Sequence, residues 1–259
     1  MMRYKGSVVV VTGGSSGIGR QIAAGLWREG ATVCLIGRDR KRLEAAIPSG
    51  ETGQERIRRY PVDITQDDRV MQLSKDLLVD NGRVDALVHS AGAFAYGEWV
   101  TLPVEKLDLL YKVNLRAPVV LTKALLPSLR VNNGQIIFIN SSAVLSNRAK
   151  VGAYSVTKHG LRQFADSLRE EVNSEGIRVI SVYPGRTATH MQELVCKLEG
   201  SEYKPERLLR SEDVAMAVIN AMCMPDTAEV TDVFIRSSRK PNKNMNTTQV
   251  EDVSGGIKR

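Results

Sequence analysis

The feature that most constrains this chain is the glycine-rich turn TGGSSGIG at Thr12–Gly19, which directly follows the β-branched run from Ser7 to Thr12. A short β-branched run bounded by glycine is typical of a buried parallel strand. Apolar residues then recur at helical spacing from Ile18, and Gly30 gives a helix stop signal. In a strand, glycine turn and helix, backbone N–H groups at the helix N-terminus receive a phosphate. The turn therefore predicts a nucleotide-binding α/β fold.

Each glycine of the turn has an expected task. Gly13 allows the tight turn, Gly17 allows the backbone to approach a pyrophosphate, and Gly19 allows close helix packing. This spacing differs from the G-x-G-x-x-G of the commoner dinucleotide fold. A loop that merely tolerates glycine is the alternative interpretation.

The rest of the chain alternates strand-like and helix-like segments, which predicts a doubly wound parallel sheet in a single α/β domain. Long helical stretches are expected at Pro103–Leu129 and Val151–Ser174. After the first strand, the expected strands are Thr32–Ile36, Ile57–Val62, Ala86–His89, Gln135–Asn140, Arg178–Tyr183 and Val230–Ile235.

A second motif, formed by a serine, a tyrosine and a lysine, is typical of a proton-transfer site. Tyr154 and Lys158 are four residues apart, and Ser141 lies thirteen residues before the tyrosine. The spacing places the phenol and the ammonium on one helix face. Lowering a phenol pKa from about 10 to about 7 needs about 4 kcal/mol, much of which a nearby cation in a partly dry site supplies. We expect Lys158 to lower the pKa of Tyr154 in this way. A half-buried tyrosine beside a solvated lysine is the alternative for the bare motif.

Taken together, these motifs resemble those of the short-chain dehydrogenase/reductase family. They follow the order and spacing of that family's motifs from residue 5 to residue 190. The segments that carry the resemblance are TGGSSGIG, Ser90–Gly92, Asn114, Ser141, YSVTK at Tyr154–Lys158 and Pro184-Gly185.

The resemblance implies an oxidoreductase that interconverts a ketone or aldehyde and an alcohol by hydride transfer. Tyr154 would be the general acid/base, Ser141 would hydrogen-bond the substrate oxygen, and Lys158 would also hold the nicotinamide ribose. Asn114 matches the helix asparagine that supports a water relay to that lysine.

The cofactor implied is NADP(H). The position of the acid that accepts the ribose hydroxyls in NAD sites falls at Gly37, and Arg38, which follows, suits a 2′-phosphate. Asp39 leaves NAD open, because a shift of one residue would place a carboxylate near the ribose. The cofactor-binding residues implied are Gly13, Ser15, Ser16, Gly17, Ile18, Gly19, Arg38, Asp63, Ile64, Ser90, Ala91, Gly92, Tyr154, Lys158, Pro184, Gly185, Thr187 and Thr189.

Ser90 is a departure from the family, which usually has asparagine there; a serine keeps a hydroxyl but has a shorter reach. The segment from Thr187 to Arg210 is expected to cover the substrate pocket, with His190 as a possible lining residue. Its apolar residues fit either an amphipathic helix or a lipophilic wall. The substrate stays open, and the alternatives are a 3-oxoacyl-thioester reductase, a sugar-nucleotide epimerase of a longer related branch, and a cofactor-sensing protein without turnover.

Charge and composition limit the kinds of binding partner and cellular location that we expect. The net charge of the chain is +7, and +4 of it lies between Arg236 and Arg259. We therefore divide the chain into a catalytic domain, residues 1–236, and a flexible basic tail, residues 237–259. Because so much of the charge lies in the tail, we expect no nucleic-acid partner. Three scattered cysteines indicate reduced thiols in a cytoplasmic protein, and the histidines show no metal spacing. No apolar run approaches the about 18 residues of a membrane span, and no signal peptide is evident. Family members pair through the two long helical stretches, which implies a homodimer or homotetramer.

Overall fold

The computed structural model describes residues 3–47 and 52–238, and within these residues a single seven-stranded parallel sheet has the order β3-β2-β1-β4-β5-β6-β7. The strands are β1 Val8–Thr12, β2 Thr32–Gly37, β3 Ile57–Pro61, β4 Ala86–His89, β5 Gln135–Ile139, β6 Arg178–Pro184 and β7 Asp232–Ile235. The helices are α1 Gly17–Arg28, α2 Arg40–Glu44, α3 Asp67–Asn81, α4 Val104–Tyr111, α5 Ala117–Val131, α6 Gly152–Val172, α7 His190–Glu199 and α8 Ser211–Met222. The prediction of a doubly wound α/β sheet is confirmed.

The chain changes direction between β3 and β4, because β1 pairs with β2 on one side and with β4 on the other. Thr12 and His89, the last residues of β1 and β4, are register partners. The turn after Thr12 and the segment after His89 therefore leave the sheet side by side. Open α/β sheets bind ligands in the crevice at such a switch point.

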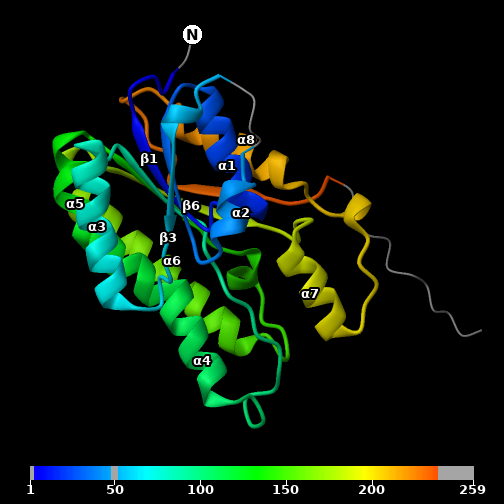
Figure 1. Ribbon diagram of the computed structural model, residues 1–259. Coiled ribbons are helices and arrows are strands. Elements are labelled where there is room, and N and C mark those ends of the chain that lie inside the picture. The colour runs from blue at the N-terminus through cyan, green and yellow to red at the C-terminus, as the bar shows by residue number, and fades with distance from the viewer. Residues whose placement is uncertain (1–2, 48–51, 239–259) are drawn as a thin grey trace, which may run out of the picture.

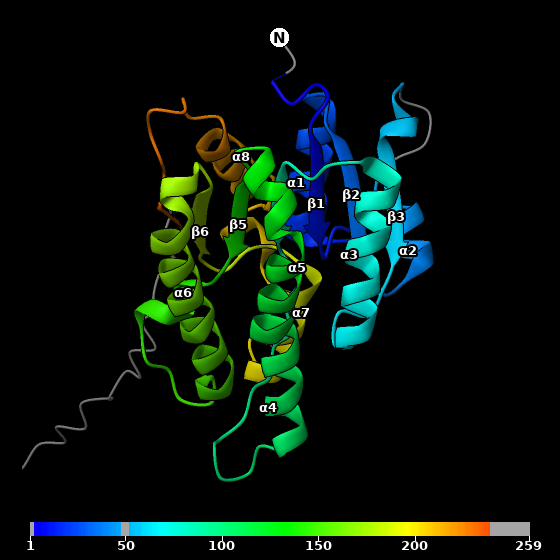
Figure 2. The ribbon, with the colours of Figure 1, turned by 90° about the vertical axis from the view of Figure 1, so that its left-hand side faces the viewer.

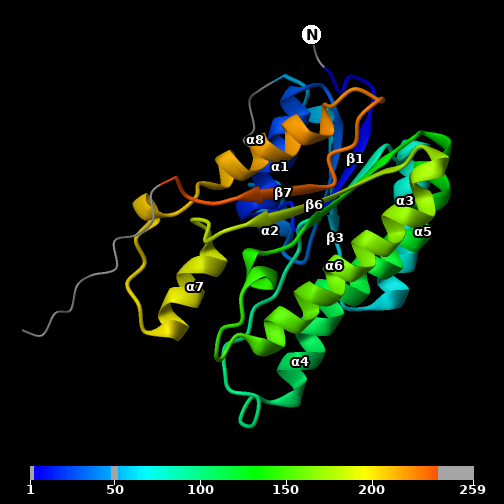
Figure 3. The ribbon, with the colours of Figure 1, turned by 180° about the vertical axis from the view of Figure 1, so that it is seen from behind.

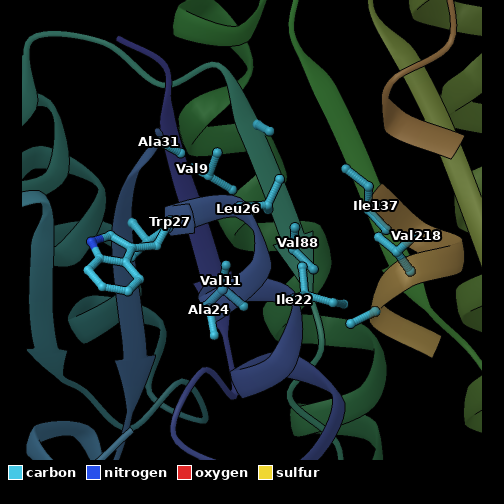
Figure 4. Packing of buried hydrophobic residues seen from close by; sticks show 14 of the residues in the cluster. Val9, Val11, Ile22, Ala24, Leu26, Trp27, Ala31, Val88, Ile137 and Val218 are labelled. Carbon is cyan, nitrogen blue, oxygen red and sulfur yellow. The ribbon is translucent and has the colours of Figure 1, made fainter. Parts of the chain in front are cut away.

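Helices cover both faces of the sheet. Figure 2 shows α3, α5 and α6 on one face, and Figures 1 and 3 show α1 and α8 on the other. Every residue of β1 is buried, as expected for a strand covered on both sides. Val9 and Val11 pack with Ile22 and Leu26 of α1 (Figure 4), whereas the alternating Val8 and Val10 face the opposite core.

The long helical stretch predicted at Pro103–Leu129 is continuous in the structure but contains a π-helical turn, Lys112–Arg116, between α4 and α5. Turns of this kind are rare and occur often at functional sites. Here the π turn includes Asn114, whose side chain is fully buried. Sequence periodicity did not indicate it.

The predicted strand ends are correct to within two residues, the largest difference being at β7, which begins at Asp232. The greater part of the predicted basic tail, residues 239–259, lies outside the described residues. No helix in the described part of the chain combines the length and the apolar character needed to cross a bilayer.

Candidate active site

The glycine turn is packed against the segment that follows β4. Gly13 has φ of 67°, and a Cβ atom added there would lie 2.9 Å from the backbone N and Cα of Ala91. A Cβ at Gly19 would lie 2.6 Å from the carbonyl oxygen of Gly13. Thr12 ties the two segments together, because its Oγ1 accepts hydrogen bonds from the N–H groups of Ser90 (3.1 Å) and Ala91 (3.2 Å). The close contacts at Gly13 and Gly19 are thus contacts of backbone with backbone.

The N-terminus of α1 leaves donors for a ligand. The helix begins at Gly17, with φ of 52°, and its N-cap Ser16 makes no side-chain capping hydrogen bond. The first N–H groups of a helix have no partner within the helix. Free first-turn donors, the helix dipole and the absence of Cβ atoms at Gly13 and Gly17 fit the pyrophosphate of a dinucleotide.

Arg38 and Asp39, the two candidate contacts for the adenosine ribose, differ in their surroundings at the end of β2. The Oδ1 atom of Asp39 accepts a hydrogen bond from the N–H of Arg42 at 3.1 Å, so this carboxylate caps α2. Arg38 is exposed. A Cβ at Gly37 would lie 3.2 Å from Oγ of Ser15, so this glycine is adjacent to the turn. Arg38 is thus exposed at the end of β2, whereas the Asp39 carboxylate is engaged as the N-cap of α2.

Asp63 and Ile64 follow β3. The Oδ1 atom of Asp63 accepts hydrogen bonds from the N–H of Thr65 at 3.0 Å and from its hydroxyl at 2.9 Å. These local bonds fix the position of the carboxylate. Its expected contact with adenine remains a prediction, as does the place of Ile64 among the cofactor contacts.

Ser141 and Tyr154 come together at the carboxyl end of β5. Ser141 follows the strand and accepts a hydrogen bond from the N–H of Ala143 at 3.1 Å, while Tyr154 lies in the first turn of α6. The Tyr154 ring is buried and packs at 5.1 Å, between ring centres, from Phe94. Burial raises the pKa of Tyr154, and its hydrogen bond with Ser141 acts in the lowering direction. The sequence did not single out Phe94.

Lys158 does not have the effect on Tyr154 that the spacing predicted. Its Nζ donates a hydrogen bond to the carbonyl oxygen of Ile139 at 2.9 Å, and burial lowers the pKa of the ammonium to about 8. The pKa of Tyr154 is raised because burial outweighs every other influence on the phenol. Four-residue spacing places two side chains on one helix face, but it does not fix where a lysine chain ends.

Asn114 joins two segments of the site. Its Oδ1 accepts from the N–H of Ala93 at 2.8 Å, and its Nδ2 donates to the carbonyl oxygen of Ala93 at 3.0 Å and to Oγ1 of Thr157 at 3.0 Å. The side chain thus connects the segment after β4 to α6. The predicted role in a water relay remains a prediction, and Thr157, its partner one residue before Lys158, was not foreseen.

His89 is buried where β4 ends. It pairs with Thr122 of α5, with 2.8 Å between Nε2 and Oγ1, and stacks on Phe138 at 5.0 Å between ring centres. Burial and, secondarily, the charge of Lys158 lower the pKa of His89 to about 3, so the ring is neutral at physiological pH. His89 therefore supports the carboxyl edge of the sheet as a neutral side chain.

The loop after Pro184-Gly185 leads into α7, whose first residues lie beside the glycine turn and the segment after β4. The methyl group of Thr189 lies 3.2 Å from where a Cβ at Gly17 would be, and Cε of Met191 lies 3.6 Å from the Cβ position of Gly92. The Thr189 hydroxyl caps α7 by accepting from the N–H of Gln192 at 3.2 Å. The Thr187 hydroxyl donates to the carbonyl oxygen of Gly185 at 3.0 Å. Both threonines, predicted to meet the nicotinamide, are thus engaged within the loop.

The apolar residues of α7 divide between two faces. Met191, Leu194 and Leu198 are 37%, 45% and 44% exposed, whereas Val195 is buried. Since Met191 lies beside Gly92, the partly exposed row continues from the crevice, which fits the lipophilic-wall interpretation. His190, at the start of the helix, is exposed and lies 3.5 Å from Glu193.

Known proteins resemble the chain over most of its length. The family model described as short chain dehydrogenase matches residues 7–198. An uncharacterized oxidoreductase of Staphylococcus epidermidis is 30% identical over 237 residues, which are 91% of this chain and 99% of that protein. A second uncharacterized oxidoreductase, from Staphylococcus saprophyticus, is 31% identical over 238 residues, again 91% of this chain and 99% of the relative.

Solved structures show the same fold. An alcohol dehydrogenase from the archaeon Thermococcus sibiricus, complexed with 5-hydroxy-NADP, superposes with a TM-score of 0.80 and 27% identity over 91% of this chain and 98% of that chain. A metagenomic short-chain oxidoreductase in complex with NADP gives a TM-score of 0.76 and 30% identity over 91% of this chain and 99% of that one.

Proposed function

The chain belongs to the short-chain dehydrogenase family of oxidoreductases, and from this premise we propose that it interconverts a ketone or aldehyde and an alcohol with NADP(H). The observation that carries the proposal is the placement of Ser141 and Tyr154 together at the carboxyl end of β5, on the same edge of the parallel sheet as the glycine turn. Two hydroxyls at the carboxyl end of a parallel sheet suit binding and protonation of a carbonyl oxygen.

The crevice fits the cofactor. The N–H groups of the first turn of α1 would receive the pyrophosphate, and Arg38 would pair with the 2′-phosphate of NADP(H). The capping bond of Asp39 supports NADP(H) over NAD, because it engages the carboxylate nearest to this position. Two solved relatives carrying NADP or its 5-hydroxy derivative point the same way. When bound, the cofactor supplies or accepts the hydride.

Residues of the chain itself would transfer the proton to the substrate oxygen. The raised pKa of Tyr154 keeps its phenol protonated at neutral pH, so the residue is ready to donate to a substrate oxygen that becomes an alkoxide. Ser141 would hydrogen-bond the same oxygen and orient it. Lys158 holds a charge within the site and, by way of Ile139, connects α6 to the end of β5.

A substrate panel tests the proposal. Ketones and aldehydes of different size and polarity are each incubated with NADPH, and with NADH in parallel, while absorbance of the reduced cofactor is recorded. Reduction of some carbonyl compounds is expected, faster with NADPH and absent from the Tyr154→Phe variant. Tight NADPH binding without turnover of any compound, in either direction, would favour the cofactor-sensing alternative.

We also propose a closed homo-oligomer, dimer or tetramer, formed through the long helices. The exposed apolar residues Leu109 of α4 and Val156 of α6 support this proposal, as does Tyr111 near the π turn. Light scattering at micromolar concentration measures the mass, and the mass of a single chain would contradict it.

A further inference from the structure

The last residue of α7 carries a carboxylate with two cationic partners. Glu199 has a side chain only 10% exposed, and its oxygens lie 3.0 Å from Arg148 and 2.5 Å from Arg186. Arg148 belongs to the segment between Ser141 and α6, and Arg186 follows β6. We call these three residues the Glu199 triad. It joins α7 to both loops that flank the candidate active site.

The triad depends on a single negative charge. Glu199 lies on the same face of α7 as the buried Gln192 and Cys196, so its carboxylate is held against the body of the protein. Within residues 3–47 and 52–238, neither Arg148 nor Arg186 has another ion-pair partner. Removing the charge of Glu199 would leave two guanidinium groups facing each other without a counter-ion, which is strongly unfavourable near a partly buried position.

The opposite end of α7 closes on the nucleotide crevice. Thr189 lies against Gly17, and Met191 lies beside Gly92. The N-terminal end of α7 therefore lies against the glycine turn and the segment after β4, and its C-terminal end is fixed by the triad. Movement of α7 away from Gly17 and Gly92 would open the side of the glycine turn that α7 covers.

We propose that Glu199 is a positioning residue whose ion pairs with Arg148 and Arg186 latch α7 over the crevice and thereby set the rate at which the dinucleotide dissociates. The ligand named here rests on the proposed function, whereas the latch itself does not. Its two arginine side chains are partly exposed, at 48% for Arg148 and 39% for Arg186, so the pairs are accessible enough to break and re-form. Loops and helices that cover a site commonly limit product release in this way.

The first experiment needs no cofactor. Glu199→Gln keeps the shape of the side chain and removes its charge, so α7 should open more often. Limited trypsin digestion, with mass spectrometry of the cut after Lys197 inside α7, should show cleavage about 10-fold faster or more, as expected for lost charge-assisted hydrogen bonds. The matched control is Glu193→Gln on the same helix, whose carboxylate is exposed and lies 3.5 Å from the exposed His190. Equal cleavage of wild type and Glu199→Gln would overturn the latch.

The second experiment connects the latch to the site. Stopped-flow fluorescence should show NADPH leaving Glu199→Gln about 10-fold faster, by the same loss, and leaving Glu193→Gln at the wild-type rate. The full charge inversion, Glu199→Arg with Arg148→Glu and Arg186→Glu, places one arginine between two carboxylates, and should restore both readouts. Faster cleavage without faster dissociation would disprove the gate, and absence of restoration would disprove the ion-pair mechanism. If the wild type binds no NADPH, the proposed function is wrong. The trypsin digestion still tests whether the Glu199 ion pairs hold α7 in place.

Discussion

The two walls of the crevice are built in opposite ways. One wall, the glycine turn with Ala91, is backbone against backbone, and a single added methyl group at Gly13 or Gly19 would come within 3 Å of it. The other wall, α7, presents long side chains that remain 37–45% exposed at Met191, Leu194 and Leu198. A wall of packed backbone has one conformation, whereas a wall of partly exposed side chains held by ion pairs can move.

This difference suggests a division of labour. The rigid wall would determine which cofactor binds, and the movable wall would determine which substrate is admitted and how fast ligands exchange. The proposed reacting groups lie at the carboxyl edge of the sheet, Ser141 directly after β5 and Tyr154 in the first turn of α6. The following changes test that division.

The largest effect is expected at Tyr154. Tyr154→Phe keeps the ring and its packing against Phe94 but removes the hydroxyl, so turnover should fall about 10²–10⁴-fold, as for a lost general acid. The fold and the affinity for NADPH should persist, because both walls are intact. Steady-state kinetics and cofactor titration measure the two quantities. A rate within about threefold of wild type would be far short of the loss of a proton donor and would refute the catalytic role.

The next effect concerns the chemistry of the rigid wall. Arg38→Ala should weaken NADPH binding by about 1.5–3 kcal/mol, the value of a charge-assisted contact, and leave NADH binding unchanged. Arg40→Ala is the control, because the Arg40 side chain is 80% exposed and pairs with Glu44. Titration calorimetry with both cofactors checks this. Equal binding of NADH and NADPH by the wild type would contradict the assignment to Arg38.

Two glycines with the same φ angle allow a direct test of how tightly the glycine turn is packed. Gly13 and Gly200 both have φ of 67°, but an added Cβ meets Ala91 at 2.9 Å at Gly13 and no atom within 4 Å at Gly200. Both alanine variants share the strain of a left-handed backbone. The excess cost at Gly13, about 1–3 kcal/mol of overpacking, should appear in stability or cofactor affinity. Chemical denaturation and cofactor titration of the two variants give that difference, and equal costs would show that the wall is less tightly packed.

His89 gives a pH dependence at the base of the rigid wall. Its folded pKa of about 3 lies below the ordinary value of 6.5. As pH falls below 6.5 the unfolded chain takes up this proton first, so the free energy of unfolding should fall by up to about 1.4 kcal/mol per pH unit until pH approaches 3. Above pH 6.5 the residue contributes no slope. Urea denaturation from pH 7 to pH 4 should show a shallower fall for His89→Gln, and identical profiles would mean that the ring is not held neutral.

The smallest effect belongs to the movable wall. Leu194→Ala should change the free energy of unfolding by no more than about 0.5 kcal/mol, since much of the side chain is already in water. Ile22→Ala, in the fully buried core behind the rigid wall, should cost about 2–5 kcal/mol. Leu194→Ala should instead alter KM for apolar carbonyl substrates. A stability loss as large as that of Ile22→Ala would show that α7 is part of the core.

Much of the rigid wall could be predicted because its determinants are local. The glycine turn, the β-branched strand before it and the helix after it follow one another within about thirty residues, and strand alternation and helical spacing follow from backbone geometry alone. The positions of Ser141 and Tyr154 could be predicted for a similar reason, since each lies at the end or start of a regular element, and their proposed roles remain predictions. The close backbone contacts at Gly13 and Gly19 fit the tight turn and the close helix packing expected of these two glycines.

Other features of the site could not be predicted, because they depend on where the end of a long side chain lies or on contacts between distant segments. The sequence placed Lys158 beside Tyr154, but tertiary packing directed its ammonium to the Ile139 carbonyl and let burial raise the pKa of the phenol. The sequence left Asp39 as a rival to Arg38, and the fold used that carboxylate to cap α2. By itself, then, the sequence determined the family, the order of elements and the positions of the proposed reacting residues, because those are set by spacing along the chain. Only the tertiary structure decided the partners of Lys158, Asn114 and Glu199, because these contacts join segments that packing alone brings together.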